Sequence, residues 1–175
     1  MSFSFTIEKK IKGKLGRAGV IATSHGAIHT PAFVPVGTKA TVKALDPADV
    51  RATGAEVVLA NAYHLALQPG ENVLAKAGGL GKFMHWEGPT MTDSGWFQVM
   101  SLSPKVDENG VTFRSPIDGS LHVMTPESSI DIQRKIGADI LFVFDECAPA
   151  DKPKRYQREA MRRTHLWAKR SLVRF

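Results

Sequence analysis

The chain has 175 residues, 43% hydrophobic and 23% charged, a composition ordinary for a globular protein that can bury one sizeable core. No apolar run approaches the roughly 18–20 residues that span a bilayer, and the first residues lack a signal-peptide pattern, so we expect no membrane association. The single cysteine, Cys147, excludes an internal disulfide and a cysteine-rich zinc site, and it favours a reducing, cytoplasmic location.

The charge is distributed unevenly along the chain. The formal net charge is +6, and basic residues gather near the N-terminus and within 152–174. Such clusters permit binding to nucleic acid or to another polyanion. On charge alone, two solvated faces explain them more simply.

The first 36 residues predict a small antiparallel sheet. Weak alternation and short apolar segments predict strands at 4–11, 18–22 and 27–36. Pro31 and Pro35 lack the N–H that a sheet ladder needs, so we expect the third strand to be an edge strand or to end irregularly.

The pattern then changes to alternating helices and strands. Asp46-Pro47 is typical of a capped helix start, Asp118-Gly119 of a hairpin turn and Gly137 of a helix end. The predicted helices span 46–51, 69–77, 125–136 and 152–175. The predicted strands lie at 56–60, directly before Asp93, and at 111–114, 121–124 and 138–144. The buried positions expected in the last helix are Met161, Leu166, Trp167, Ala168 and Leu172.

Two of these strands end in carboxylates. One ends at Asp93, and the continuous apolar run 140–144 ends at Asp145, Glu146 and Cys147. Parallel strands deliver ligand-binding groups to their carboxyl ends, so we expect Asp93 and Asp145 to face one pocket. Strand–helix alternation predicts a parallel sheet with crossover helices. A complete (β/α)8 barrel needs about 250 residues, so we expect the first part of a longer protein.

Several short motifs occur in one order across nearly the whole chain. They are TPAFVPVGT at 30–38, NAYHL at 61–65, TDSG at 92–95 followed by Phe97 and Gln98, GVTF at 110–113, TPE at 125–127, FDEC at 144–147 and WAKRS at 167–171. Each motif alone is weak, but together they are specific. In them the chain resembles the tRNA-guanine transglycosylases, the queuine or archaeosine tRNA-ribosyltransferases, and the bacterial branch fits best.

The resemblance implies an α/β fold, the N-terminal portion of an irregular (β/α)8 TIM barrel preceded by a small antiparallel sheet. Residues 1–36 would form the sheet and residues 37–175 the first half of the barrel. The remaining barrel, a nucleophilic aspartate and a zinc subdomain with three Cys and one His would lie beyond residue 175. No cofactor is therefore expected in this chain, although zinc is expected in the full-length family protein.

The same resemblance implies an activity. The family exchanges guanine at the tRNA wobble position for a 7-deazaguanine such as preQ1 or queuine, through a covalent ribosyl–enzyme intermediate. The expected partners are tRNA and a guanine, preQ1 or queuine base, with a homodimer of the full-length form left open.

The matching positions carry the family's roles to this chain. Asp93 resembles the general acid/base residue that also contacts the base, and Asp145 resembles the aspartate that reads the base edge. Phe97 matches the aromatic residue that stacks on the base. Ser94 and Gly95 resemble the loop that approaches the base closely. Local alternatives exist: the two aspartates could cap a turn or a helix, and Phe97 could be a core residue.

Three neighbouring residues are harder to assign. Trp96 is predicted to be one of the substrate-binding residues of this loop, at a position where the family usually has a second Gly, which permits positive φ and close backbone approach. Its indole points out of the pocket or the pocket is altered, and restoring Gly is expected to increase base exchange. Cys147 is interpreted as a pocket wall rather than a nucleophile. Glu146 is expected to orient its neighbours at most.

Two functions of different class fit the sequence. The first is an enzyme segment that carries base recognition and acid/base chemistry but is inactive alone, because the nucleophile is missing. The second is a truncated, non-catalytic homologue that binds a base or RNA. A separately encoded half that assembles with a complementary chain is a third reading.

Overall fold

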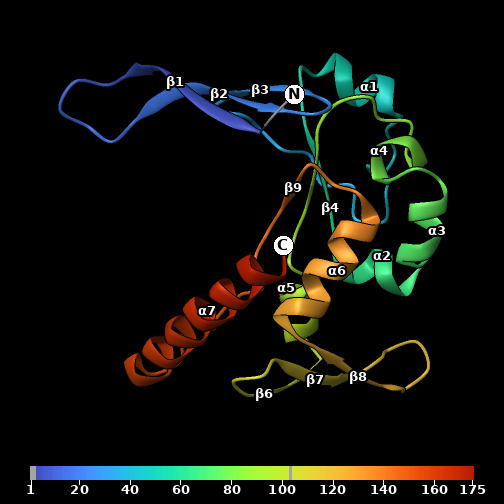
Figure 1. The fold of residues 1–175 in the computed structure, drawn as a ribbon, viewed down its shortest axis with the longest axis vertical. Coiled ribbons are helices and arrows are strands. Elements are labelled where there is room, and N and C mark those ends of the chain that lie inside the picture. The colour runs from blue at the N-terminus through green and yellow to red at the C-terminus, as the bar shows by residue number, and fades with distance from the viewer. Residues whose placement is uncertain (1–2, 103) are drawn as a thin grey trace.

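An antiparallel sheet forms the N-terminal arm of the molecule (Figure 1). The computed structural model describes residues 3–102 and 104–175. The sheet contains β1 (Ser4–Lys10), β2 (Arg17–Thr23) and β3 (Gly26–Thr30) in that spatial order. The prediction of an antiparallel sheet in this region is therefore confirmed. The third strand ends earlier than predicted, at Thr30, because Pro31 has no N–H for the ladder.

A parallel sheet positions the predicted site. It contains β4 (Val58–Ala60), β5 (Thr90–Thr92) and β9 (Ile140–Leu141) in the order β4-β5-β9, with β9 at an edge. Val36 adds an isolated parallel bridge to Leu59 beside β4. The described residues thus form a mixed α/β fold with an open sheet and not a closed barrel. The barrel assignment and the domain boundary after residue 36 stay predictions.

Helices connect the parallel strands. Before β4 comes α1 (Pro47–Ala52). Between β4 and β5 lie α2 (Ala62–Leu67), α3 (Glu71–Lys76) and α4 (Leu80–Phe83), and α6 (Pro126–Ile136) leads into β9. The predicted caps are present: the Asp46 and Thr125 side chains accept from Asp49 N and Ser128 N, and Gly137 ends α6 in the left-handed region. α2 and α4 were not predicted.

A second antiparallel sheet lies beneath the parallel one (Figure 1). It contains β6 (Lys105–Val106), β7 (Val111–Arg114) and β8 (Leu121–Met124), with Arg114 paired to Leu121 across the predicted hairpin. The hairpin prediction is confirmed, and β6 is an addition. The strand predicted over 138–144 is shorter, although the Phe142 amide still donates to the Thr92 carbonyl at 3.1 Å.

The long helix α7 (Lys154–Arg174) closes one side of the main core. This core contains Tyr63, Trp96, Val99, Val111, Phe113, Met124, Phe144 and Trp167. Trp167 is fully buried as predicted, but Met161 and Leu172 are 56% and 70% exposed, so their predicted burial was wrong. The buried stripe instead runs through Ala160 and Ser171, each one position earlier along the helix. Within residues 3–102 and 104–175, no helix has the length and apolarity to cross a membrane.

Candidate functional site

Asp93 lies directly after β5 and is held by four hydrogen-bond donors. Its Oδ2 accepts from the Asn61 side chain and from Gln98 Nε2 at 3.1 Å. Its Oδ1 accepts from the backbone amides of Ala62 at 2.9 Å and Gly95 at 3.1 Å. The carboxylate therefore has a fixed orientation at the carboxyl ends of β4 and β5. Sequence reasoning assigned no role to Asn61 or Gln98, although Asn61 follows its strand in the same way as Asp93.

Ser94 connects this position to Asp145. The Ser94 hydroxyl donates to Asp145 Oδ1 at 2.8 Å, and the Ser94 carbonyl accepts from the Ser129 hydroxyl at 2.8 Å. Ser94 is 5% exposed, whereas Asp145 is half-buried. Because β5 and β9 are adjacent and parallel, the residues that follow them lie at the same end of the sheet. Ser94 thus links the segment that carries Asp93 to Asp145.

A fully buried glutamine supports this end of the sheet. Gln133 of α6 accepts from the Thr92 hydroxyl at 2.9 Å and from the Phe142 amide at 3.1 Å. Its Nε2 donates to the Phe142 carbonyl at 2.9 Å and to the Ser129 hydroxyl at 3.1 Å. One side chain therefore ties β5, the end of β9 and α6 together. The isoleucines around Gln133 predicted the helix but not the hydrogen bonds that Gln133 makes.

The backbone turn at Gly95 explains how Trp96 is accommodated. Gly95 has φ 83°, a left-handed conformation, and Trp96 is the first residue of the short helix α5 (Trp96–Met100). Trp96 itself is helical, so it does not adopt the positive φ that a Gly at this position would permit. The indole is 2% exposed and packs against Phe144 and Trp167, with ring centroids 6.2 and 6.3 Å away. Trp96 is a core residue that supports the site from beneath.

Phe97 and Cys147 differ in their surroundings. Phe97 is 64% exposed, so its ring is not a core residue. Cys147 is partly buried and packs against the main core cluster. The stacking role of Phe97 and the pocket-wall role of Cys147 stay predictions.

Glu146 faces α7 rather than the two aspartates. Its carboxylate accepts from the Arg163 guanidinium, at 3.0 Å from Nη2, and from the Tyr156 hydroxyl at 2.9 Å. Its backbone amide donates to Thr164 Oγ1 at 2.9 Å. Burial, followed by the hydrogen bond to Glu146, raises the pKa of Tyr156. Glu146 thus anchors the chain after Asp145 to the long helix.

Three buried polar atoms near Asp93 have no hydrogen-bond partner among the described residues. They are Tyr63 Oη, Trp96 Nε1 and Gln98 Oε1. Unpaired buried groups cost roughly 1–3 kcal/mol each, and native proteins tolerate them mainly at functional sites. Trp96 and Gln98 follow Asp93 in the chain, and Gln98 also donates to its carboxylate.

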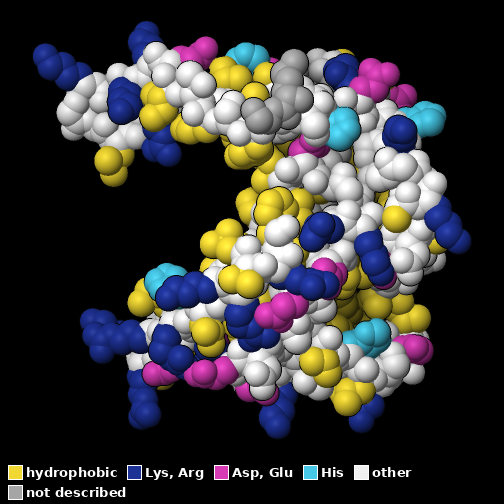
Figure 2. Space-filling model, in the orientation of Figure 1, with side chains coloured by type: hydrophobic (Ala, Val, Ile, Leu, Met, Phe, Trp, Pro, Cys, Tyr) yellow, Lys and Arg dark blue, Asp and Glu magenta, His cyan; other side chains and the backbone are white. Residues whose placement is uncertain are grey.

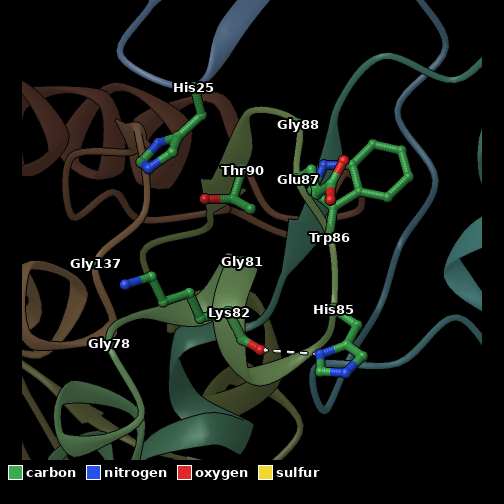
Figure 3. Close-up of a pocket in the computed structure, with 10 residues that line it drawn as sticks. All are labelled: His25, Gly78, Gly81, Lys82, His85, Trp86, Glu87, Gly88, Thr90 and Gly137. Atoms are coloured by element: carbon green, nitrogen blue, oxygen red, sulfur yellow. Dashed lines mark hydrogen bonds between the residues drawn. The ribbon is translucent and has the colours of Figure 1, made fainter.

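A cavity of about 600 Å³ lies at the opposite, amino end of the parallel strands (Figure 3). It is lined by His25, Gly78, Gly81, Lys82, His85, Trp86, Glu87, Gly88, Thr90 and Gly137. Beside it, Asp139 accepts from His25 Nδ1 at 2.6 Å and from the Thr90 amide at 2.9 Å. Burial opposes ionisation of Asp139, but these donors outweigh it and lower its pKa. None of the residues that the sequence assigned to the site lines this cavity.

The described residues contain no group of three or more His, Cys, Asp or Glu side chains able to hold a metal ion. The groups that follow β5 and β9 include two carboxylates, the Ser94 hydroxyl and the exposed Phe97 ring. Ionised carboxylates accept hydrogen bonds, and a neighbouring ring offers a stacking face. Such a set can recognise a planar molecule that presents donors along one edge.

Comparison with known proteins identifies the family of the chain. The family model described as queuine tRNA-ribosyltransferase matches residues 12–175. Proteins of that name from Herpetosiphon aurantiacus and Synechococcus elongatus are 53% and 51% identical to this chain over 98% of its length. The matched regions make up 44% and 45% of those two proteins. One from Zymomonas mobilis is 53% identical over 97% of the chain and 44% of its own length. The chain spans a little under half the length of these relatives. The resemblance seen in the sequence is confirmed, and the chain belongs to the queuine tRNA-ribosyltransferase family.

Proposed function

We propose that this chain carries the base-recognition and acid/base half of an enzyme that exchanges the tRNA wobble guanine for a 7-deazaguanine such as preQ1 or queuine. The observation that carries this proposal is the contact of Ser94 with Asp145 directly beside Asp93. Family membership supports tRNA as the substrate and guanine transglycosylation as the reaction class. A cytoplasmic location and a homodimer of the full-length form belong to the same proposal.

Asp145 is the base-reading group in this proposal. Guanine presents N1–H and an exocyclic amine on its Watson–Crick edge, and an ionised carboxylate can accept from both. Ser94 occupies one lone-pair position of Oδ1, which leaves acceptor capacity on the carboxylate. Phe97 supplies an exposed ring for stacking, as recognition of an unstacked base requires.

Asp93 is the group that moves protons to and from the leaving base. Base exchange at a ribose carbon resembles retaining glycoside hydrolysis, in which a second carboxylate attacks the anomeric carbon. The other aspartates among the described residues lie in helix caps, in turns, in ion pairs, or at Asp139 beside His25 at the amino end of the parallel strands. We therefore assign the nucleophile, and the zinc of the full-length protein, to the part of the family that this chain does not span.

Calorimetric titration of the purified chain with guanine or preQ1 tests base recognition. Asp145→Asn replaces an acceptor by a donor that faces donors on the base, so we expect at least about tenfold weaker binding. The matched control is Asp151→Asn at an exposed position, which is expected to bind as the parent does. Equal affinities for all three proteins would contradict the assignment of Asp145.

Exchange is tested separately with tRNA and radiolabelled guanine. The chain alone should incorporate no label above background, because loss of one member of a catalytic pair costs several orders of magnitude in rate. Incorporation by protein free of host enzyme would contradict the assignment of the nucleophile. Failure of both base binding and RNA binding would contradict this proposal and also the alternative of a non-catalytic homologue that binds a base or RNA.

A further inference from the structure

Most cations in the C-terminal part of α7 have ion-pair partners, whereas Lys169 is exposed and has none among the described residues. In the C-terminal part, Arg163 pairs with Glu146, Arg170 pairs with Glu127, and Arg174 pairs with Asp131. The Arg170–Glu127 pair has two hydrogen bonds of 2.7 Å, and chiefly through them Arg170 lowers the pKa of Glu127 to about 2. These arginines are used within the fold, where they attach the helix to its neighbours.

The cations at the start of α7 are different. Lys152, Lys154, Arg155 and Arg158 are all exposed, and none makes an ion pair or a side-chain hydrogen bond with the described residues. The nearby Glu159 is directed to Arg162 at 3.3 Å. We call these four residues the α7 basic patch. Its positive charge is not neutralised by an ion pair with the described residues.

Helical geometry directs the α7 basic patch outward. With 3.6 residues per turn, positions three, four or seven apart share one face of a helix. The buried face carries Tyr156, Ala160 and Trp167. Arg155 and Arg158 lie on the opposite face. Figure 2 shows dark-blue side chains gathered over the projecting part of α7.

The fold also fixes where the α7 basic patch lies relative to the candidate site. Only the segment 146–153 separates Asp145 from the helix, and Glu146 bonds to both Tyr156 and Arg163. Gln157 Nε2 donates to the Pro149 carbonyl at 2.6 Å, which holds this connection against the first turn of α7. The Phe144 amide donates to Ser171 and the Glu146 amide to Thr164, so this connection runs back along α7. The patch therefore lies about 9–15 Å along the helix axis from Thr164, a distance that phosphates a few nucleotides away from the bound base can reach.

We propose that the α7 basic patch binds the phosphodiester backbone of the RNA whose base enters the Asp93–Asp145 site. This inference rests on the proposed function, because that function makes RNA the polyanion presented at this end of the sheet. Lys and Arg side chains neutralise phosphates without reading sequence, and an exposed, unpaired cation stripe fits that role. The second basic cluster, Lys9, Lys10, Lys12 and Lys14, lies on the N-terminal arm, which projects from the other end of the molecule (Figure 1).

Fluorescence anisotropy with an RNA stem-loop carrying an abasic wobble position tests the proposal. The test variant changes Lys152, Lys154, Arg155 and Arg158 together to Gln. The matched control changes Lys9, Lys10, Lys12 and Lys14 to Gln, which removes the same charge. Each phosphate contact contributes about 0.7–0.9 to the slope of log affinity against log salt. We expect the test variant to bind at least tenfold more weakly with a slope reduced by about 2–3, and the control to change by less than about threefold.

Three results would overturn the inference. Equal weakening in both variants would show that only net charge matters, and unchanged binding in the test variant would show that the patch does not contact RNA. Tighter binding to anionic phospholipid vesicles than to the stem-loop at the same salt would assign the patch to a membrane surface. Failure of the proposed function is distinguishable, because it abolishes the effect of Asp145→Asn on free-base binding without altering binding to the abasic RNA.

Discussion

The two ends of one parallel strand pair carry aspartates in opposite conditions. At the amino end, Asp139 has a side chain that is 2% exposed, and it accepts from His25, Ser24 and Thr90. At the carboxyl end, Asp145 is half-buried and accepts from Ser94. Both residues flank β9, so their difference comes from the groups that neighbouring segments bring to them.

The difference indicates what each carboxylate can do. A carboxylate has about four lone-pair positions, and Asp139 fills them with donors from the β2–β3 turn and from β5. It therefore holds the N-terminal sheet to the parallel sheet. Asp145 keeps acceptor capacity for donors outside the described residues. This contrast distinguishes Asp145 as the carboxylate with free acceptor capacity, because Asp93 at the same end also accepts from four donors.

The largest expected effect comes from removing the Trp96 side chain, which packs in the core near the carboxyl ends of the parallel strands. Trp96→Gly deletes a fully packed indole between Phe144 and Trp167, so we expect a loss of about 3–5 kcal/mol in the free energy of unfolding. Urea denaturation measures the change, with Phe97→Ala at the exposed neighbour as the control within about 0.5 kcal/mol.

This expectation reverses the one drawn from sequence. A family-like Gly at position 96 was expected to improve base exchange, whereas the structure predicts a destabilised site. If Trp96→Gly left stability unchanged and made exchange faster in the full-length protein, a Gly at this position would improve base exchange and the indole would lie outside the core.

The second effect separates the two ends directly. Asp139→Asn replaces one acceptor oxygen by a donor that faces the donors of His25 or Thr90, so we expect it to destabilise the chain by about 1–3 kcal/mol. Asp145→Asn should change stability by less than about 0.5 kcal/mol, because one partly buried contact is affected. Urea titrations of both variants give the comparison, and equal losses would remove the distinction between a structural and a ligand-binding aspartate.

Local sequence signals predicted much of this arrangement. Asp46, Thr125 and Gly137 are caps whose effect depends on residues within one helical turn, and the helices that they bound were predicted correctly. Asp93 and Asp145 were located because each follows an apolar strand. Such signals need no knowledge of the distant chain.

What sequence could not predict depends on contacts between distant segments. The helices α2, α4 and α5 are too short to show a helical period. Gln133 is buried only because Thr92 and Phe142 supply its hydrogen bonds. Likewise, the side of α7 that packs was misjudged at Met161 and Leu172, since propensity does not reveal which residues Trp167 will meet.

A smaller effect concerns the contact that orients Asp145. Ser94→Ala removes the hydroxyl that donates to Asp145 Oδ1 while keeping the backbone, so we expect free-base affinity to fall about three- to tenfold. Ser128→Ala, at a helix cap away from Asp145, is the matched change of hydroxyl to methyl group and should leave base affinity unaltered. Calorimetric titration measures both, and a gain in affinity for Ser94→Ala would mean that the hydroxyl competes with the base.

The smallest effect is the acid dependence of the amino-end cluster. The folded-state pKa of Asp139 is lowered from its ordinary value of 3.8, with burial opposing ionisation and the donors from His25, Thr90 and Ser24 outweighing it. A lowered carboxyl pKa stabilises the fold above the unfolded-state value, and this contribution is lost as the pH falls through the folded-state value. The difference in unfolding free energy between the parent and Asp139→Asn should therefore be constant well above pH 3.8 and narrow below it. The effect is small because a protonated carboxyl group still accepts from the Thr90 amide. Denaturation at a series of acidic pH values measures it, and a difference that stays constant or widens as the pH falls would show that the ionised form of Asp139 does not hold the two sheets together.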